Sequence, residues 1–458
     1  MLTFSKIFTI IDEKNELRKV AIARIFVSLV VAHRTYLNIA DYSKVADFDF
    51  NLFVLYALLA VSLLAAVGLL STFFAMMTVT LYFISDKTLG IHGLGSAALA
   101  NVMLIIVLIP SGHYYSIDRL LRKREGVGVI DSLRCSPTFI QNTYICAFFI
   151  FAISNLASLA GHALSENWID LSVIEQTFKN PFYSKYYSFF LNLEGRSDFA
   201  FSFLSRLSTI FQMLWQLLMI PMIFFKFGRY IVMLWGFAFF LMSEIFLNLG
   251  YLDMYLFALW SLLFIGLPNL FPRVVAKEKR SLQRFVKFPF YIVFPFFLAF
   301  TLASSSTAFQ LFKITTGASN SNSSPMAVIK SELSDSTLFL HGFANFVGLG
   351  APNVFNKPDM DAAFIYLILE RFDAEADEWA LVPFTNYEGG RLKMHRSDLV
   401  RYKYSIPLRR CLQSGQWKRC ITYVRPIAKM DQDGRRGGKY RAIFINKIIS
   451  EEETFIFN

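Results

Sequence analysis

The sequence predicts a polytopic α-helical membrane protein of about nine spans with a C-terminal β-rich domain outside the cytoplasm. Of the 458 residues, 55% are hydrophobic, 50 are Phe and only 17% are charged, whereas roughly a quarter of an ordinary soluble domain is charged. The charged residues flank long apolar runs, so the formal charge of +11 follows the pattern of the positive-inside rule. This composition excludes a disordered chain, a nucleic-acid-binding globule and most classes of soluble enzyme.

Nine apolar segments are candidates for crossing about 30 Å of hydrocarbon. Several are shorter than the roughly 20 residues of a straight span. The sequence therefore does not fix their exact boundaries, and one or two are compatible with re-entrant segments. They lie near residues 20–33, 52–69, 71–85, 95–110, 143–161, 207–225, 230–248, 250–268 and 288–303.

The least certain division falls within residues 52–84, which contain no charged residue. This stretch is too long for one ordinary span. A helix–turn–helix fits its length better than one very long helix. We therefore predict two helices that are divided at Gly68–Ser71.

Basic residues predict the orientation of these segments. If the N-terminus is cytoplasmic, the inside segments are 1–19, 111–142, 226–229 and 269–287, and together they hold 17 Lys and Arg residues. The outside segments before the last span hold far fewer. The positive-inside rule therefore predicts a multi-pass protein of the cell (inner) membrane with a cytoplasmic N-terminus and an extracytoplasmic C-terminal domain.

The composition changes after the ninth segment. Residues 315–325 are mostly small and polar, which is typical of a flexible linker, so the chain divides into a helical bundle at 1–305, a linker at 306–330 and a domain at 331–458. In that domain, runs rich in β-branched and aromatic residues alternate with turns, which favours a small β-sandwich or half-barrel. The runs are LFLHGF, FIYLILERF, EWALVPF, TYVRPI, YRAIFI and TFIFN.

Cys411 and Cys420 flank a predicted hairpin turn in the sequence CLQSGQWKRC. An exported domain permits a disulfide that joins two antiparallel strands. Paired strands also bring two thiols together without a bond, so both states stay open. We expect no metal site, because two Cys residues without CxxC spacing or a paired His form a poor zinc-binding set.

Four stretches carry a family pattern in their order and spacing. They are AIARIFVSLVVAHR (21–34) with its interior Arg24, IPSGHYYSIDRLLRKR (109–124) with Ser116 and Asp118, FAISNLASLAGHALSENWIDL (151–171), and FFLMSEIFLNLGYLDMYLFALWSLLF (239–264). Together they resemble the transmembrane core shared by vitamin K-dependent γ-carboxylase and its bacterial relatives, the horizontally transferred transmembrane (HTTM) domain. The resemblance covers about residues 1–305, and an extracytoplasmic β-rich tail is also a recurring feature of that family.

Two departures from the family pattern argue against γ-carboxylation. The family's third stretch supplies a Lys that acts as a base on reduced vitamin K, but no Lys lies between residues 147 and 178 here, and His162 stands six residues before Trp168. The family's fourth stretch usually carries a His where this chain has Phe240. Smaller bacterial relatives include a membrane protein that helps mature the sporulation-delaying peptide toxin. The resemblance therefore implies peptide maturation or export.

Titratable side chains at membrane depth are costly, so each is a candidate site residue. His162 and Glu166 are spaced i, i+4, so that Glu166 would orient His162 for proton transfer. Alternatively, both residues mark the solvent-exposed end of a helix beside an interfacial Trp168. Glu244 lies in the middle of the seventh segment without a local partner, and its alternative role is a buried hydrogen bond from a protonated Glu. The candidate catalytic residues are His162, Glu166 and Glu244.

Three further polar residues favour structural roles. Arg24 lies about one turn inside the first segment, and we expect its side chain to snorkel to the cytoplasmic headgroups. Ser116 and Asp118 predict a helix N-cap at the cytoplasmic face.

Two functions are compatible with the sequence. The first is maturation or modification of a peptide or lipid-like substrate at the outer face of the membrane, without the family's catalytic Lys. The second is a non-catalytic membrane anchor or assembly subunit whose β-domain binds a protein partner. The lipid bilayer is a partner in both, nucleic acid is a partner in neither, and the sequence identifies no cofactor.

Overall fold

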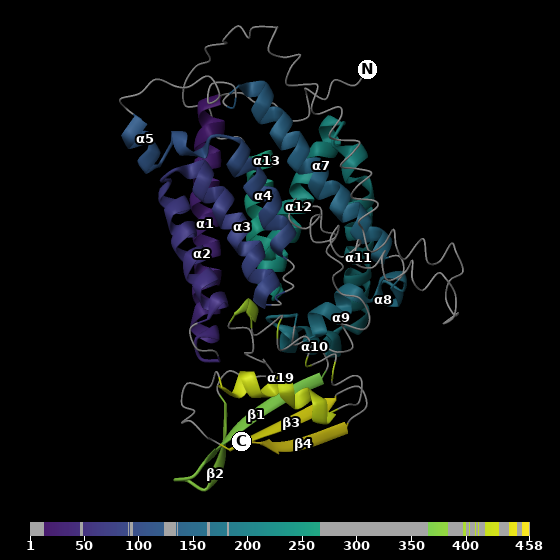
Figure 1. The fold of residues 1–458 in the computed structure, drawn as a ribbon. Coiled ribbons are helices and arrows are strands. Elements are labelled where there is room, and N and C mark those ends of the chain that lie inside the picture. Colours follow the sequence, from purple (N-terminus) through teal and green to yellow (C-terminus); the bar gives the residue numbers. More distant parts are fainter. Residues whose placement is uncertain are drawn as a thin grey trace, which may run out of the picture.

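A computed structural model gives the structure of the chain (Figure 1). It describes residues 13–45, 49–89, 91, 95–122, 134, 136–162, 165–180, 183–265, 365–382, 397–399, 403, 408, 411, 417–429, 439–446 and 451–457. The predicted ninth span at 288–303, the inside segment at 269–287 and the linker at 306–330 lie outside the described residues.

Eight of the nine predicted spans coincide with helices. Five of these helices, α1, α2, α7, α11 and α12, are long and apolar enough to cross a membrane, and α4 and α13 are shorter apolar helices. The count of nine spans therefore stays a prediction. The eight helices are α1 (Glu13–Tyr42), α2 (Phe50–Val67), α3 (Ser71–Leu89), α4 (Gly95–Leu108), α7 (Pro137–His162), α11 (Asp198–Met222), α12 (Lys226–Phe246) and α13 (Leu252–Phe264).

Short helices connect the long ones at the two ends of the bundle. Helices η2 (Ser111–His113) and α5 (Ile117–Arg122) follow α4, whereas α8 (Glu166–Ile169), α9 (Val173–Lys179) and α10 (Tyr187–Arg196) fill the connection between α7 and α11. Helix α5 lies at the end of the bundle opposite the C-terminal sheet, and α9 and α10 lie at the end nearest to it (Figure 1).

The charge-free stretch is divided where the sequence predicts. Helix α2 ends at Val67, and Gly68 adopts a left-handed conformation with φ of 73° while its N–H donates to the carbonyls of Leu64 and Ala65. Helix α3 begins at Ser71. Only Gly adopts this conformation without strain, so the glycine ends the first helix and turns the chain into the second.

The centre of the bundle is aromatic. Trp260 of α13 is fully buried and contacts the rings of Phe151 (α7), Trp215 (α11) and Phe240 (α12), with ring centroids 5.2–5.8 Å apart. Gly236 lets α12 approach this indole, since a Cβ there would lie 2.4 Å from Nε1. Phe240, which stands where the resembling family has a His, therefore serves this structure as a packing residue.

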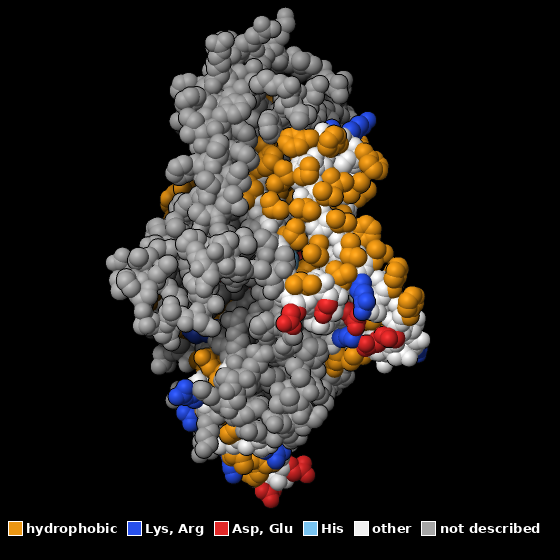
Figure 2. Space-filling view, turned by 90° about the vertical axis from the view of Figure 1, so that its right-hand side faces the viewer, with side chains coloured by type: hydrophobic (Ala, Val, Ile, Leu, Met, Phe, Trp, Pro, Cys, Tyr) orange, Lys and Arg blue, Asp and Glu red, His pale blue; other side chains and the backbone are white. Residues whose placement is uncertain are grey.

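Helices α11 and α12 expose large apolar side chains on their outer face. Figure 2 shows this apolar surface, with charged side chains gathered at its lower border. Helix α11 has 25 residues and is about 37 Å long, enough to cross the hydrocarbon with some tilt. Exposure of this extent is typical of a surface that contacts a membrane or another protein. The exposed residues include Phe199, Phe203, Leu207, Phe211, Leu214, Leu217, Leu234 and Leu241.

The C-terminal part contains one antiparallel sheet with a helix. Strands β1 (Ile365–Asp373), β2 (Glu378–Leu381), β3 (Tyr440–Asn446) and β4 (Glu451–Phe457) form a four-stranded sheet in the order β2-β1-β3-β4. The runs FIYLILERF, EWALVPF, YRAIFI and TFIFN thus contain strands as predicted. A second sheet, which a sandwich needs, is not present among the described residues.

The predicted hairpin around the two cysteines is wrong. Helix α19 (Trp417–Lys429) contains Cys420 and the run TYVRPI, which we expected to be a strand. The physical reason is the spacing of the buried residues, because Cys420, Val424, Ile427 and Ala428 recur at i, i+4, i+7 and i+8, which is the period of one helix face. The β-branched residues of the run misled the prediction, since tertiary packing overrides their strand propensity.

A second hydrophobic core joins the two parts of the chain. Ile39 and Tyr42 of α1 and Leu55 of α2 belong to the same buried cluster as Leu369 of β1 and Val424 of α19. The C-terminal sheet and helix therefore pack on the end of the bundle.

Candidate functional site

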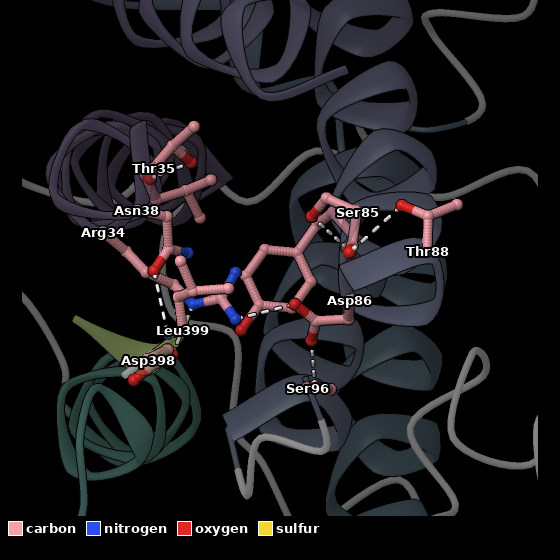
Figure 3. Close-up of polar contacts among 11 residues, drawn as sticks. Arg34, Thr35, Asn38, Ser85, Asp86, Thr88, Ser96, Asp398 and Leu399 are labelled. Atoms are coloured by element: carbon pink, nitrogen blue, oxygen red, sulfur yellow. Dashed lines mark hydrogen bonds and ion pairs between the residues drawn. The ribbon is translucent and has the colours of Figure 1, made fainter. Parts of the chain in front are cut away.

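The site that the structure singles out is a buried ionic centre between the bundle and the C-terminal part. Arg34 of α1 is 0% exposed. Its Nη2 donates to Oδ1 of Asp86 in α3 at 2.7 Å, and its Nε donates to Oδ2 of Asp398 at 2.5 Å (Figure 3). The ring of Tyr82 lies 4.1 Å from the guanidinium carbon. Arg34 therefore bridges a carboxylate of the bundle and one from the distant C-terminal part.

Neighbouring polar groups hold the two carboxylates and the chain around them. Ser96 Oγ donates to Oδ2 of Asp86 at 2.8 Å, and the N–H of Leu399 donates to Oδ1 of Asn38 at 3.1 Å (Figure 3). Asn38 follows Arg34 by four residues, so both side chains leave the same face of α1. One helix face thus binds two consecutive residues of the C-terminal part, one by its side chain and one by its backbone.

Among the described residues, the charges of this centre do not balance. Two described carboxylates surround one guanidinium, and all three side chains are less than 10% exposed. A buried ion pair gives little net stability, because desolvation offsets the attraction, but removing one partner costs about 3–5 kcal/mol. The centre therefore specifies how the two parts are joined. Tyr255 of α13 is fully buried and interacts electrostatically with Arg34. Three buried polar atoms of the centre have no hydrogen-bond partner in the described structure: Arg34 Nη1, Asn38 Nδ2 and Tyr255 OH.

Arg24 does not snorkel to the headgroups, which corrects our expectation. Its side chain is fully buried, and its guanidinium donates to the carbonyls of Ser111 at 2.9 Å and Tyr115 at 2.7 Å and to Ser71 Oγ at 3.2 Å. These acceptors surround the α2–α3 turn and the segment after α4. Backbone carbonyls and a hydroxyl from these segments bind both terminal nitrogens of the guanidinium inside the protein, so Arg24 has a structural role.

Ser116 and Asp118 both cap helices, but different ones. Ser116 Oγ accepts from the N–H of Arg119 at 3.1 Å at the start of α5, as predicted. Asp118 instead accepts from the N–H groups of Leu70 and Ser71 at 2.7 and 2.8 Å. A carboxylate at the first turn of α3 satisfies donors that the helix leaves free.

His162 and Glu166 do not share a helix face. Helix α7 ends at His162, and Glu166 begins the separate helix α8, so the i, i+4 relation does not hold in the structure. His162 is 3% exposed and stacks on Trp168, with ring centroids 3.7 Å apart. Glu166 is exposed, and Trp168 is buried rather than an interfacial anchor.

Glu244 lies near the end of its helix, not in the middle of a span. Helix α12 ends at Phe246, and the Glu244 side chain is 36% exposed. Lys185 approaches it, with Nζ 3.5 Å from Oε1, and also donates to its backbone carbonyl. The sequence shows no local partner for this carboxylate, and the structure supplies a distant one. The partner lies 59 residues away in the sequence, where no local pattern could show it.

Cys411 and Cys420 form a disulfide in the structure, with Cα atoms 5.7 Å apart. It ties Cys411 to a buried position of α19 rather than joining two strands. Among the described residues, no group of three or more His, Cys, Asp or Glu side chains could hold a metal ion.

The fold and the site define an α-helical protein with several membrane-length apolar helices, on whose end a small antiparallel sheet with a helix is docked. No family model, curated protein or solved structure matches the chain. Membership of the HTTM family is therefore a proposal that rests on the four sequence stretches alone.

Proposed function

We propose that this chain is an integral membrane protein that works as an anchor or assembly subunit. Its bundle holds the C-terminal domain in a fixed orientation at the outer face of the membrane, and that domain binds a peptide or protein partner there. The observation that carries the proposal is the buried bridge from Arg34 to Asp398. A buried ion pair between the two parts gives little net stability but can specify one arrangement, which suits a domain that presents a surface at a set angle to the membrane.

The arrangement of the candidate catalytic residues supports a binding role. General acid–base catalysis requires groups within hydrogen-bond reach of one another or of a shared substrate. Here His162 is buried against Trp168, Glu166 is exposed on a separate helix, and Glu244 is engaged by Lys185. The three residues lie in three different environments.

The test is affinity purification of the full-length protein from native membranes with quantitative mass spectrometry. The variant Asp398→Lys places a cation against Arg34 while the bundle keeps its own Asp86 pair, so we expect the domain to undock and a stoichiometric partner to be lost. Glu375→Lys, in the exposed turn between β1 and β2, makes the same change of charge and should retain the partner. Equal recovery of the partner with both variants would refute the role of the docked domain.

A second candidate function is maturation of a peptide or lipid-like substrate at the outer face, as the HTTM resemblance implies. It is favoured by His162, a buried imidazole that lies among the polar side chains of Ser158 and Gln216. The test is comparison of exported peptides and lipids from cells that carry the wild-type protein, His162→Ala or Glu244→Ala at equal membrane levels. Unchanged product profiles for both variants would remove these residues from any such chemistry.

A further inference from the structure

Helices α7 and α11 bury a neutral polar cluster between them. The cluster consists of Ser158 and His162 of α7, Gln212 and Gln216 of α11, and Trp168 of α8, and each is at most 5% exposed. The two helices pack through Phe151 and Trp215, and Thr209 of α11 donates to the carbonyl of Leu171 just after α8. Polar side chains between apolar membrane-length helices are costly and mark functional sites.

Some polar atoms of this cluster form hydrogen bonds with one another or with a neighbouring side chain. Ser158 Oγ and His162 Nε2 are 3.2 Å apart, and Gln212 Oε1 accepts from Trp235 Nε1 at 3.3 Å. The rings of His162 and Trp168 are parallel to within 7° and stacked at 3.7 Å, which fixes both rings. The site is therefore held in place by its own contacts.

Three other atoms of the cluster make no hydrogen bond of ordinary geometry in the described structure. They are Nδ1 of His162, Nε1 of Trp168 and Oε1 of Gln216. The Gln216 side chain is within hydrogen-bonding reach of the His162 ring, which still leaves one lone pair of Gln216 Oε1 open, and the indole N–H of Trp168 has no partner among the described residues. A buried polar atom without a partner costs about 1–3 kcal/mol. An unpaired indole donor in the same cluster as an amide oxygen with an open lone pair indicates that a bound molecule completes the site.

We infer that this cluster binds the hydroxyl group of an uncharged lipid alcohol. The indole Nε1 only donates and the amide Oε1 only accepts, and a hydroxyl group can satisfy both because it carries one proton and two lone pairs. The cluster contains no Asp, Glu, Lys or Arg, so nothing in it would compensate a charged ligand.

The route to the site points to a lipid-soluble molecule. The outer face of α11 carries exposed apolar side chains such as Leu214, Leu217 and Leu218 on either side of buried Gln216. The buried cluster therefore borders an apolar outer surface, and the proposed ligand would insert its hydroxyl from that side and leave its chains on the apolar surface. The inference does not depend on the docking of the C-terminal domain, which rests on other residues.

The experiment uses purified full-length protein in nanodiscs and a diazirine-bearing dioleoylglycerol as photoreactive probe. We expect labelling to map to peptides of α7, α8 or α11 and to be competed by unlabelled dioleoylglycerol. The methyl ether of the same probe, which has lost its donor, should label about tenfold less, since loss of one buried hydrogen bond of about 1.4 kcal/mol is a tenfold change.

Variants assign the labelling to the amide acceptor and the indole donor. Gln216→Leu removes the acceptor and Trp168→Phe removes the donor while keeping an aromatic ring, and each should reduce labelling about tenfold. Gln212→Leu is the matched control, since it makes the same change one turn earlier at equal burial but affects a residue that already has a partner in Trp235. Labelling with this control should stay within about twofold of the wild type.

Thermal melting distinguishes a ligand-binding site from buried polar atoms that simply lack a partner in the folded protein. Dioleoylglycerol should raise the melting temperature of the wild type but not that of Gln216→Leu. The inference is overturned if Gln216→Leu labels as strongly as the wild type, or if the phosphatidic acid form of the probe labels more strongly than the alcohol. It is also overturned if Gln216→Leu raises the melting temperature of the ligand-free protein while the melting temperature of the wild type does not respond to the alcohol.

Discussion

Arg34 and Asp398 are separated by 364 positions in the sequence, yet the Nε of one donates to the Oδ2 of the other at 2.5 Å in a fully buried contact. Asp86 binds the opposite side of the same guanidinium. Helix α1 therefore binds the C-terminal part of the chain directly through a buried side chain.

Arg34→Met should destabilise the protein far more than Asp398→Asn. Loss of the guanidinium leaves two buried carboxylates without a cation, at a cost of about 3–5 kcal/mol, whereas loss of one carboxylate leaves Arg34 neutralised by Asp86. Thermal unfolding in detergent measures which of the two variants is less stable. Adding Asp86→Asn to Arg34→Met should recover part of the loss, and a larger effect for Asp398→Asn than for Arg34→Met would contradict the charge imbalance.

Gly68→Ala should destabilise the α2–α3 turn. The residue has a positive φ, and a Cβ would lie 2.4 Å from the Cβ of Ser116 and 2.5 Å from Nη1 of Arg24, so both the backbone and the Arg24 side chain must move. We expect a loss of more than about 1 kcal/mol in thermal unfolding. Gly195→Ala is the control, because nothing lies within 4 Å of its added Cβ; equal effects at both positions would refute the explanation.

Asp49 should contribute a pH-dependent stabilisation to the start of α2. Burial favours its neutral form, but hydrogen bonds from the Leu52 N–H at 2.9 Å and the Tyr42 hydroxyl at 2.7 Å outweigh it and lower the pKa of Asp49 below its ordinary value. Asp49→Ala should cost about 1 kcal/mol at neutral pH, as for other helix caps.

The sign of the pH effect follows from the lowered pKa. A group that ionises more readily in the folded state stabilises it fully above the unfolded pKa, about 3.9 for Asp, and loses that contribution as the pH falls through the folded value. The difference in melting temperature between wild type and Asp49→Ala should therefore be constant from pH 7 to about pH 5 and shrink below about pH 4. A difference that grows on acidification would show that the cap acts without its charge.

The disulfide and the proposed orientation can be tested together. A membrane-impermeant thiol reagent added to intact cells should leave Cys411 and Cys420 unlabelled until a reductant is added, and should then label both. Cys146, a free thiol within α7, serves as the internal reference and should stay unlabelled. Labelling of Cys411 and Cys420 only after the cytoplasmic side is opened would reverse the proposed orientation.

Local sequence signals predicted the helices of the bundle because their causes are local. Uninterrupted apolar runs gave the positions of eight helices, and Gly68 marked a turn that no other residue type adopts without strain. The strands β1 to β4 followed from their β-branched and aromatic residues in the same way. Helix α19 did not, because the β-branched residues of its run favoured a strand, and the packing of its one apolar face overrode that propensity.

The polar sites depended on partners that no local pattern reveals. Glu244 has no partner in its own stretch of sequence, and Lys185 supplies one from another segment. Arg34 counted only as a basic residue at the end of a span, although it organises the most buried ionic centre of the described chain, and nothing around Asp398 signals its role. The one available signal was the presence of Arg34 and Asp86 at the margins of two apolar runs.

The sequence by itself determined that much of this chain forms apolar helices of membrane length, because hydrophobic burial follows composition and does not depend on which residues become neighbours. Only the tertiary structure decided which charges meet, that Arg34 joins α1 to the C-terminal part and that His162 faces Trp168 and Gln216. Electrostatic and hydrogen-bonding partners are set by distance and orientation in space, and these are fixed only when the helices pack.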